Sequence, residues 1–178
     1  MADGLNAVQE TKAKLVRHYA KKPDEVAGLR QICVAWQREF NFWSFDETLP
    51  VLARSGSLVF YVPMTSDRDP KGTQWDGALL VDLGPYEADI LFIYVRPERR
   101  REQLALAMFR ELVEHVKKIP QIESIFLDVR VSNQSAISLY DKLGMKRVRV
   151  RKKYYASNGE DALVYGLTID RSTEKKPN

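Results

Sequence analysis

Polar and apolar residues alternate along this chain with two different periods. Residues 12–19 and 124–131 alternate between polar and apolar, which is typical of strands, and the segments 57–62, 77–83, 88–95, 146–155 and 162–169 are also predicted to be strands. Apolar residues at helical spacing mark 24–37, 100–119 and 133–143, and Ser44, with Glu47 three positions later, can cap a short helix through residue 53. The pattern predicts about seven strands and about four helices.

The order of these elements predicts an α/β (α+β) fold with a mixed, mostly antiparallel sheet. The strands at 57–62, 77–83 and 88–95 follow one another closely, as in an antiparallel meander. A helix separates the strands at 88–95 and 124–131, so we expect these two to be parallel with a right-handed crossover. A length of 178 residues suits one domain, which we assign to 12–170, with a flexible N-terminus at 1–11 and a disordered tail at 171–178.

Composition narrows the class of protein further. The single cysteine, Cys33, excludes an intrachain disulfide and falls on the apolar stripe of the first helix, where it acts as a small hydrophobe. No apolar run approaches the roughly 20 residues of a membrane span, and the N-terminus lacks the apolar core of a signal peptide. We therefore expect a cytoplasmic protein with no membrane partner, and no spacing of residues predicts a metal site.

Two basic clusters account for much of the net charge of +4, at 99–101 and 147–153. The first begins a helix directly after a strand, in the segment VRPERRREQLA at 95–105. Helix N-termini carry unpaired N–H groups and bind phosphate, so this segment is a candidate phosphate site. The alternative is a solvated, charged helix start.

A second chemical segment lies at 127–144. Strand alternation turns Asp128 away from the apolar residues beside it, and Asn133 is placed to cap the next helix. Tyr140 lies about two turns along that helix, on its apolar side. A carboxylate and a phenol can serve as general base and acid, while the alternative for Tyr140 is a core residue with one hydrogen bond.

Four pieces of the chain carry a family resemblance: FWSFDETL (42–49), VRPERRREQLA, LDVRVSNQSAISLYDKLGM (127–145) and RKKYYASNGEDALVYGL (151–167). The sequence from 43 to 168 resembles the GNAT superfamily of N-acetyltransferases. Within it, the chain looks most like the RimI-type enzymes that acetylate the N-terminal alanine of a ribosomal protein. The resemblance implies transfer of acetyl from acetyl-CoA to an amine, most directly the α-amine of a protein N-terminus.

The resemblance also implies roles for individual residues. Acetyl-CoA would lie where the two central parallel strands splay apart, with Asp128 as base, Tyr140 as acid and no metal. The cofactor-binding residues implied are Ile93, Tyr94, Val95, Arg100, Arg101, Glu102, Gln103, Leu104, Ala105, Leu106 and Asn133. Trp43, Tyr154 and Tyr155 would bind the acceptor, which is a protein or peptide N-terminus such as that of a ribosomal protein.

Two positions depart from the family pattern. Gln103 stands where the phosphate loop usually has its first glycine, and Asp128 where RimI-like enzymes have glutamate. The first departure leaves open a degenerate domain that binds CoA or a protein without catalysis. We do not expect direct nucleic-acid binding, because the second basic cluster alternates with Val148 and Val150 and forms no aromatic platform. The protein could be a monomer or a homodimer.

Overall fold

A computed structural model describes residues 14–17, 23–40, 45–53, 56–65, 67–71 and 73–171. In chain order its elements are β1 (Lys14–Arg17), α1 (Pro23–Phe40), α2 (Phe45–Leu52), β2 (Ser57–Pro63), β3 (Trp75–Leu83), β4 (Glu87–Val95), the 3₁₀ turn η2 (Pro97–Arg99), α3 (Leu104–Lys117), β5 (Ser124–Arg130), α4 (Gln134–Lys142), β6 (Lys146–Tyr155) and β7 (Glu160–Thr168). The predicted mixture of strands and helices is confirmed.

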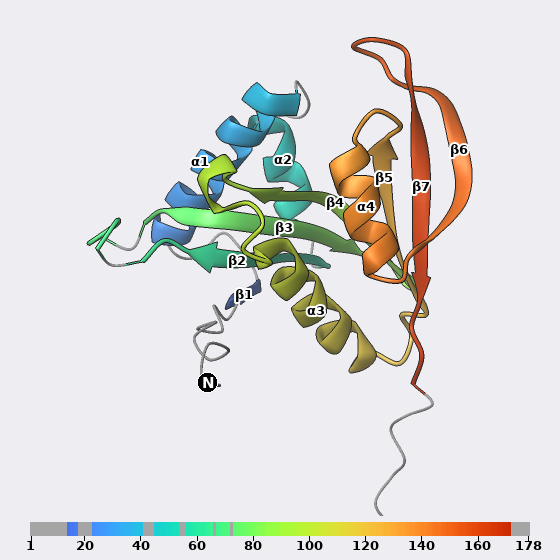
Figure 1. Ribbon diagram of the computed structural model, residues 1–178. Coiled ribbons are helices and arrows are strands. Elements are labelled where there is room, and N and C mark those ends of the chain that lie inside the picture. The colour runs from blue at the N-terminus through green and yellow to red at the C-terminus, as the bar shows by residue number, and fades with distance from the viewer. Residues whose placement is uncertain are drawn as a thin grey trace, which may run out of the picture.

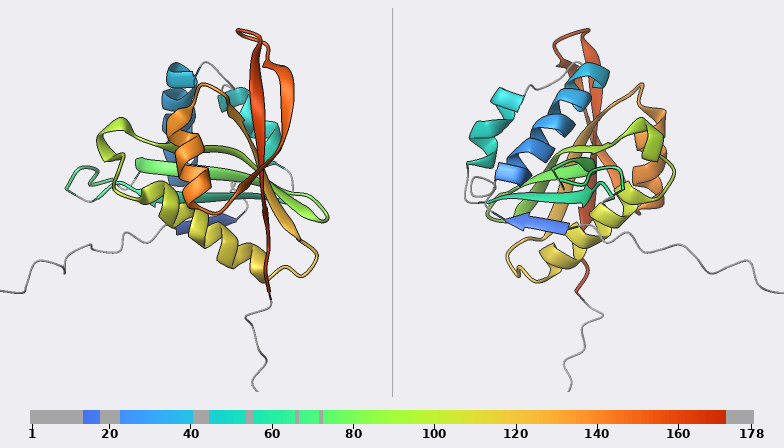
Figure 2. Two further views of the ribbon diagram at one scale, coloured as in Figure 1. Left: turned by 45° about the vertical axis from the view of Figure 1, so that its right-hand side comes forward. Right: turned by 90° about the vertical axis from the view of Figure 1, so that its left-hand side faces the viewer.

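The strands form one seven-stranded sheet in the order β1-β2-β3-β4-β5-β7-β6. All neighbouring strands are antiparallel except β4 and β5, which are parallel as the intervening helix predicted. Helices α1 and α2 cover one face of the sheet, and α3 and α4 cover the other (Figures 1 and 2). The architecture is therefore a sheet between two helical layers.

Each helical layer encloses its own apolar core. Between α1 and the sheet lies a cluster that includes Leu29, Ile32 and Cys33, all fully buried, so the predicted apolar stripe of this helix is confirmed. Gly28 lets α1 approach closely, because a Cβ atom there would lie only 2.4 Å from the ring of Trp75. The larger core lies between the sheet and the helices α3 and α4.

Strand β4 contains a β-bulge that divides it between the two cores. Val81 of β3 pairs with Ile90 while the adjacent Leu80 pairs with Phe92, which leaves Leu91 without a partner on β3. Ile90 therefore faces the α3 side of the sheet and Phe92 faces the α1 side. The parallel pairing with β5 also ends here, at Ile90 with Leu127, so the expected splaying of the two central strands is confirmed.

The expectation of a helix starting at residue 100 is wrong. Residues 97–99 form η2, and α3 begins only at Leu104. In between, Arg101 and Gln103 adopt positive φ angles of 68° and 61°, which interrupt any helix. Arginine, glutamate and glutamine all favour helices, so the prediction, which relied on local propensity, placed the start of the helix too early in the chain.

Beyond β7, Arg171 still makes specific contacts, although the sequence assigned it to the tail. Its guanidinium donates hydrogen bonds to backbone carbonyls after α3, including that of Ile119 at 2.9 Å. The ordered chain thus extends at least to this residue. No described helix combines the length and the apolarity that a membrane crossing requires.

Candidate functional site

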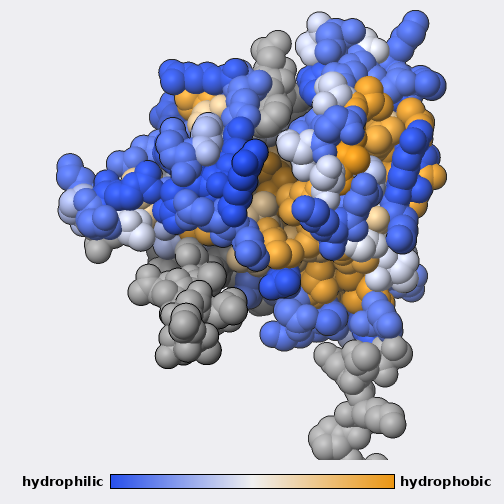
Figure 3. Space-filling model, in the orientation of Figure 1, coloured by the Kyte–Doolittle hydropathy of each residue, from blue (hydrophilic) through white to orange (hydrophobic). Residues whose placement is uncertain are grey.

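A cavity of about 920 Å³ opens where β4 and β5 part. Residues of both strands line it, together with residues of α1, α4, β6 and β7. Figure 3 shows apolar surface at the centre of the molecule, between two more polar halves. The residues that line the cavity extend from Glu87, at the start of β4, to Arg100, beyond the end of β4.

The far half of β4 offers backbone groups to this cavity. Ile93, Tyr94 and Val95, which the family resemblance implied as cofactor-binding residues, all line it and lie past the last residue that pairs with β5. On the β5 side, alternate N–H and C=O groups of this segment therefore have no strand partner. The carbonyl of Val95 accepts a hydrogen bond from Nε of Arg100 at 3.1 Å. A ligand with amide groups could pair with this edge as a strand does.

The N-terminus of α3 lies next to β4 and carries no side-chain cap. Gln103, at the N-cap position, is in the left-handed conformation and makes no capping hydrogen bond. Leu104 is buried in the core and Leu106 lines a separate groove between α3 and α4, so of this turn only Ala105 faces the main cavity. The turn can therefore offer an anion its backbone N–H groups rather than its side chains.

The three arginines before α3 have different environments. Arg100 lines the cavity and pairs with Glu39 of α1, with 2.6 Å between Nη2 and Oε1. Arg99 turns away to Asp76 and Glu102, while Arg101 is exposed. Glu102 is exposed, its carboxylate pairs with Arg99, and it does not line the cavity.

The two predicted catalytic residues approach the cavity from opposite faces of the sheet. Ile125, Leu127 and Val129 of β5 belong to the α3-side core, so Asp128 faces the α1 side as predicted. Tyr140 belongs to the α3-side core, yet it lines the same cavity as Asp128. The parted strands bring both side chains to one space.

Asp128 has a carboxylate held near one cation. Its Oδ1 lies 3.4 Å from Nε of Arg151, and no described residue donates a hydrogen bond to this buried oxygen. The guanidinium of Arg151 also lies 5.1 Å above the ring centre of Tyr154. The carboxylate therefore keeps an open position for a proton donor such as an amine or a water.

Tyr140 is only 5% exposed, and its ring centre lies 5.9 Å from that of Tyr165. Burial, and to a lesser degree the charge on Tyr155, raises the pKa of the Tyr140 phenol above its ordinary value of 10.0. The phenol therefore stays protonated at neutral pH, as a proton donor must.

The remaining predicted residues lie around the cavity. Asn133 caps α4 as predicted, with its Oδ1 accepting from the N–H of Ala136 at 3.2 Å, and it also lines the cavity. Tyr154 and Tyr155 line it from β6, the first 41% and the second 8% exposed. Trp43 and Ser44 lie outside the described residues.

Sequence reasoning missed several charged residues of this cavity, among them Asp89 and Arg151. Asp89 of β4 lines it, and burial together with the nearby carboxylates of Glu87 and Asp128 raises the pKa of Asp89. Asp89 is the one acidic residue in the apolar segment 88–95, and this exception to the pattern could have identified it as a candidate site residue. No local pattern in the sequence could have predicted the ion pair between Arg151 and Asp128, because it depends on how β6, β7 and β5 pair in the sheet.

Within the described part of the chain, no group of three or more histidine, cysteine, aspartate or glutamate side chains could hold a metal ion.

Cys33 is fully buried, and this burial raises the pKa of its thiol to about 12, so it acts as the small hydrophobe that was predicted.

Comparison with known proteins adds independent information. The model of the Acetyltransferase (GNAT) family matches residues 33–145, more than half of the chain. A Bacillus subtilis protein, whose name proposes ribosomal protein bS18-alanine N-acetyltransferase activity, is 43% identical over 84 residues, which are 47% of this chain and 55% of that protein. An N-alpha-acetyltransferase of Sulfurisphaera tokodaii is 41% identical over 80 residues, 45% of this chain and 47% of the relative. The chain spans about half the length of these relatives.

The fold also matches solved structures. Arabidopsis thaliana NAA60 in complex with acetyl-CoA superposes with a TM-score of 0.72 at 18% identity, over 88% of this chain and 97% of NAA60. At this identity the likeness concerns the fold.

Proposed function

Because the chain belongs to the GNAT acetyltransferase family, we propose that it is an N-acetyltransferase that transfers acetyl from acetyl-CoA to the α-amine of a protein N-terminus. The observation that carries this proposal is the cavity between the parted strands β4 and β5, lined by Asp128 from one face of the sheet and by Tyr140 from the other. An acyl transfer to an amine needs one group that accepts the proton of the amine and another that protonates the departing sulfur.

The residues present fit acetyl-CoA. The open edge of β4 at Ile93, Tyr94 and Val95 can pair with the amides of a pantetheine arm. The uncapped N-terminus of α3 can bind the pyrophosphate through backbone N–H groups, and Asn133 lies farther along the same cavity. When bound, acetyl-CoA supplies the acetyl group as a thioester.

Asp128 prepares the acceptor. An α-amine has a pKa of about 8, so most of it is protonated at neutral pH and cannot attack a carbonyl. The open position on Oδ1 of Asp128 accepts this proton, directly or through one water, since aspartate is one methylene shorter than glutamate. The amine is then a nucleophile beside the acetyl group.

Tyr140 completes the transfer. The departing sulfur is a thiolate until it gains a proton, and the buried phenol of Tyr140 donates one. Backbone N–H groups on the open edge of β4 stabilise negative charge on the acetyl oxygen. These groups belong to the protein, so the proposed reaction uses no metal.

The proposed acceptor is a peptide with a free N-terminus. Its support is twofold: two matched relatives are named for N-terminal acetylation, and Tyr154 and Tyr155 line the same side of the cavity as Asp128. We propose that these two tyrosines and Trp43 bind the first residues of the acceptor, for which a ribosomal protein is one candidate.

Isothermal calorimetry with acetyl-CoA, followed by addition of a panel of N-terminal peptides, tests the proposal. Binding of acetyl-CoA followed by release of CoA with at least one peptide supports it. Binding without transfer to any amine favours a module that only binds CoA. No binding at millimolar acetyl-CoA contradicts the proposal altogether.

A further inference from the structure

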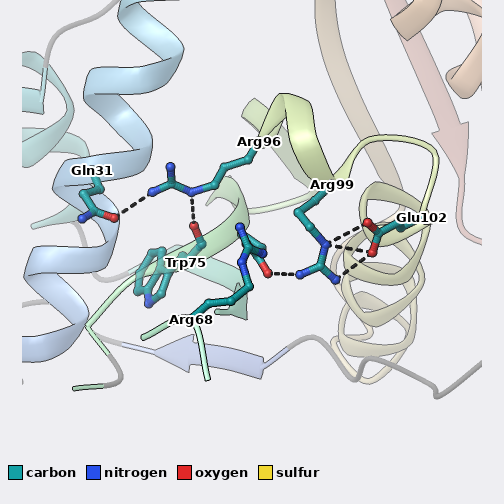
Figure 4. Close-up of polar contacts among 7 residues, drawn as sticks. Gln31, Arg68, Trp75, Arg96, Arg99 and Glu102 are labelled. Atoms are coloured by element: carbon teal, nitrogen blue, oxygen red, sulfur yellow. Dashed lines mark hydrogen bonds and ion pairs between the residues drawn. The ribbon is translucent and has the colours of Figure 1, made fainter. Parts of the chain in front are cut away.

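A buried ionic network lies behind the loop that precedes α3, outside the cavity. Figure 4 shows Arg68, Arg96 and Arg99 converging on the start of β3, with Glu102 beside Arg99. At its centre is Asp76, whose side chain is 1% exposed although it is a carboxylate. A carboxylate this deeply buried needs positive partners.

Asp76 has two such partners, which come from different loops. Arg68, between β2 and β3, lies 3.2 Å from Oδ1 of Asp76. Arg99, the last residue of η2, pairs with Oδ2. The carboxylate thus joins the β2–β3 loop to the segment that leads into α3.

Arg99 carries the connection forward along the chain. Its Nε and Nη2 bind the carboxylate of Glu102, with Nη2 at 2.7 Å from Oε2. One planar guanidinium therefore bridges a buried strand residue and a residue of the loop. The bridge spans residues 100–101 and ends one position before Gln103.

The start of this segment is held to the same strand residues. The N–H of Arg96 donates to the carbonyl of Asp76 at 2.9 Å, and Nε of Arg96 donates to the carbonyl of Trp75 at 2.8 Å. The segment is therefore attached to β3 at residue 96 and, through Arg99, again at residue 102.

On either side of the attachment at residue 102, the backbone adopts a conformation that its side chains disfavour. Arg101 and Gln103 have φ angles of 68° and 61°, the left-handed region that glycine adopts readily and in which other residues are strained. Neither residue is glycine, so contacts with the rest of the protein must hold this shape. The attachments through Asp76 and Arg99 are placed to do so, together with the ion pair of Arg100 with Glu39.

We propose that Asp76 and Arg99 are positioning residues that hold the loop 100–103 in the conformation that directs the N–H groups of the α3 N-terminus toward the phosphates of the cofactor. The network takes over the role of the missing glycine at position 103. This proposal rests on the proposed function, since it concerns how the same site binds acetyl-CoA.

Two matched variants test it in the full-length protein. Arg99→Gln removes the bridge to the loop, whereas Arg68→Gln removes the other partner of Asp76 and leaves the bridge intact. We expect Arg99→Gln to raise the Kd for acetyl-CoA about tenfold or more, since small misplacements of binding groups have effects of this size. We expect kcat at saturation to stay within about twofold. Arg68→Gln should leave the Kd unchanged.

A rescue separates positioning from direct contact between Arg99 and phosphate. Glycine at position 103 adopts the left-handed backbone without strain, so adding Gln103→Gly to Arg99→Gln should restore part of the lost affinity. The gain should exceed the one that Gln103→Gly gives in the wild-type background, because the two changes act on one loop. If the double variant binds as weakly as Arg99→Gln alone, Arg99 acts on the phosphates itself and the proposal is wrong.

Limited trypsin digestion without acetyl-CoA gives a readout that is independent of the activity. The loop keeps its cleavage sites after Arg100 and Arg101 in both variants. Cleavage there should be faster in Arg99→Gln than in wild type or Arg68→Gln, because a released loop opens more often. Equal cleavage in all three proteins would overturn the proposal. If the wild type fails to bind acetyl-CoA, the proposed function is wrong, while digestion still decides whether the network holds the loop.

Discussion

The phenol of Tyr140 is buried, has a raised pKa and lines the cavity. Replacing Tyr140 with phenylalanine removes the proposed proton donor and little else. We expect kcat to fall about 100-fold, a typical contribution of a general acid. The Kd for acetyl-CoA and the melting temperature should change little, since phenylalanine keeps the buried ring and its contact with Tyr165.

Steady-state kinetics together with thermal unfolding checks this expectation. An unchanged kcat would show that Tyr140 is a core residue and that another group protonates the sulfur.

Glu160 links stability to pH. It accepts hydrogen bonds from the N–H of Ser132 at 2.8 Å and from Arg130 at 3.2 Å, and contacts with these residues and Asn158 lower the pKa of Glu160 from 4.5 to about 2. A lowered pKa in the folded state means that its stabilisation is complete above pH 4.5 and is lost as the pH falls toward 2.

Urea unfolding across this pH range should show that Glu160→Gln lowers stability near neutral pH and has little effect near pH 2. Glu123→Gln, at an exposed loop position, serves as the matched control. A constant difference between Glu160→Gln and wild type at every pH would contradict this linkage.

At the residue scale, the sequence predicted those features of single residues that depend only on the local pattern around them. Alternation along β5 predicted that Asp128 faces away from the apolar residues, and helical spacing predicted the capping role of Asn133. The ion pair between Asp128 and Arg151 was out of reach, because these residues are 23 positions apart and meet only through the pairing of three strands.

The turn before α3 contains two of the three non-glycine residues with positive φ in the described part of the chain. Gln103 has a φ of 61°, where a non-glycine residue costs roughly 1–2 kcal/mol. Gln103→Gly should therefore stabilise the protein by about 1 kcal/mol. It should also tighten acetyl-CoA binding, because glycine adopts the left-handed conformation of this loop without strain.

Chemical denaturation and calorimetry measure the two effects. The matched control is Gln134→Gly, at the first residue of α4, where the backbone is helical and glycine should destabilise by up to about 1 kcal/mol. Weaker acetyl-CoA binding by Gln103→Gly would mean that the glutamine side chain is itself a ligand.

At the scale of helices and strands, the predictions are confirmed where the hydrophobic pattern keeps a single period without interruption. Every strand and α-helix of the structure was predicted from the sequence, but the 3₁₀ turn η2, the start of α3 and the bulge in β4 were not. Ala88, Ile90, Phe92 and Tyr94 alternate as if they shared one face, and only the pairing with β3 shows that Leu91 divides them. Bulges depend on the partner strand, which local alternation does not contain.

At the scale of the whole molecule, the proposed chemistry depends on the β-bulge in β4. The bulge at Leu91 coincides with the end of the pairing between β4 and β5, so the sheet opens at its centre. The opening lets Asp128 and Tyr140, on opposite faces, line a single cavity of about 920 Å³. The sequence supplied the family resemblance, and the structure supplies the physical reason that the two residues can act on one substrate.

The most direct test of the central claim is the position of the transferred acetyl group. A peptide with a free N-terminus and an internal lysine, and the same peptide with a blocked N-terminus, are each incubated with the protein and acetyl-CoA. Fragmentation mass spectrometry then locates the modification. We predict one acetyl group on the α-amine of the free peptide and no acetylation of the blocked one. Acetylation of the lysine in both peptides, at the same rate, would contradict the account.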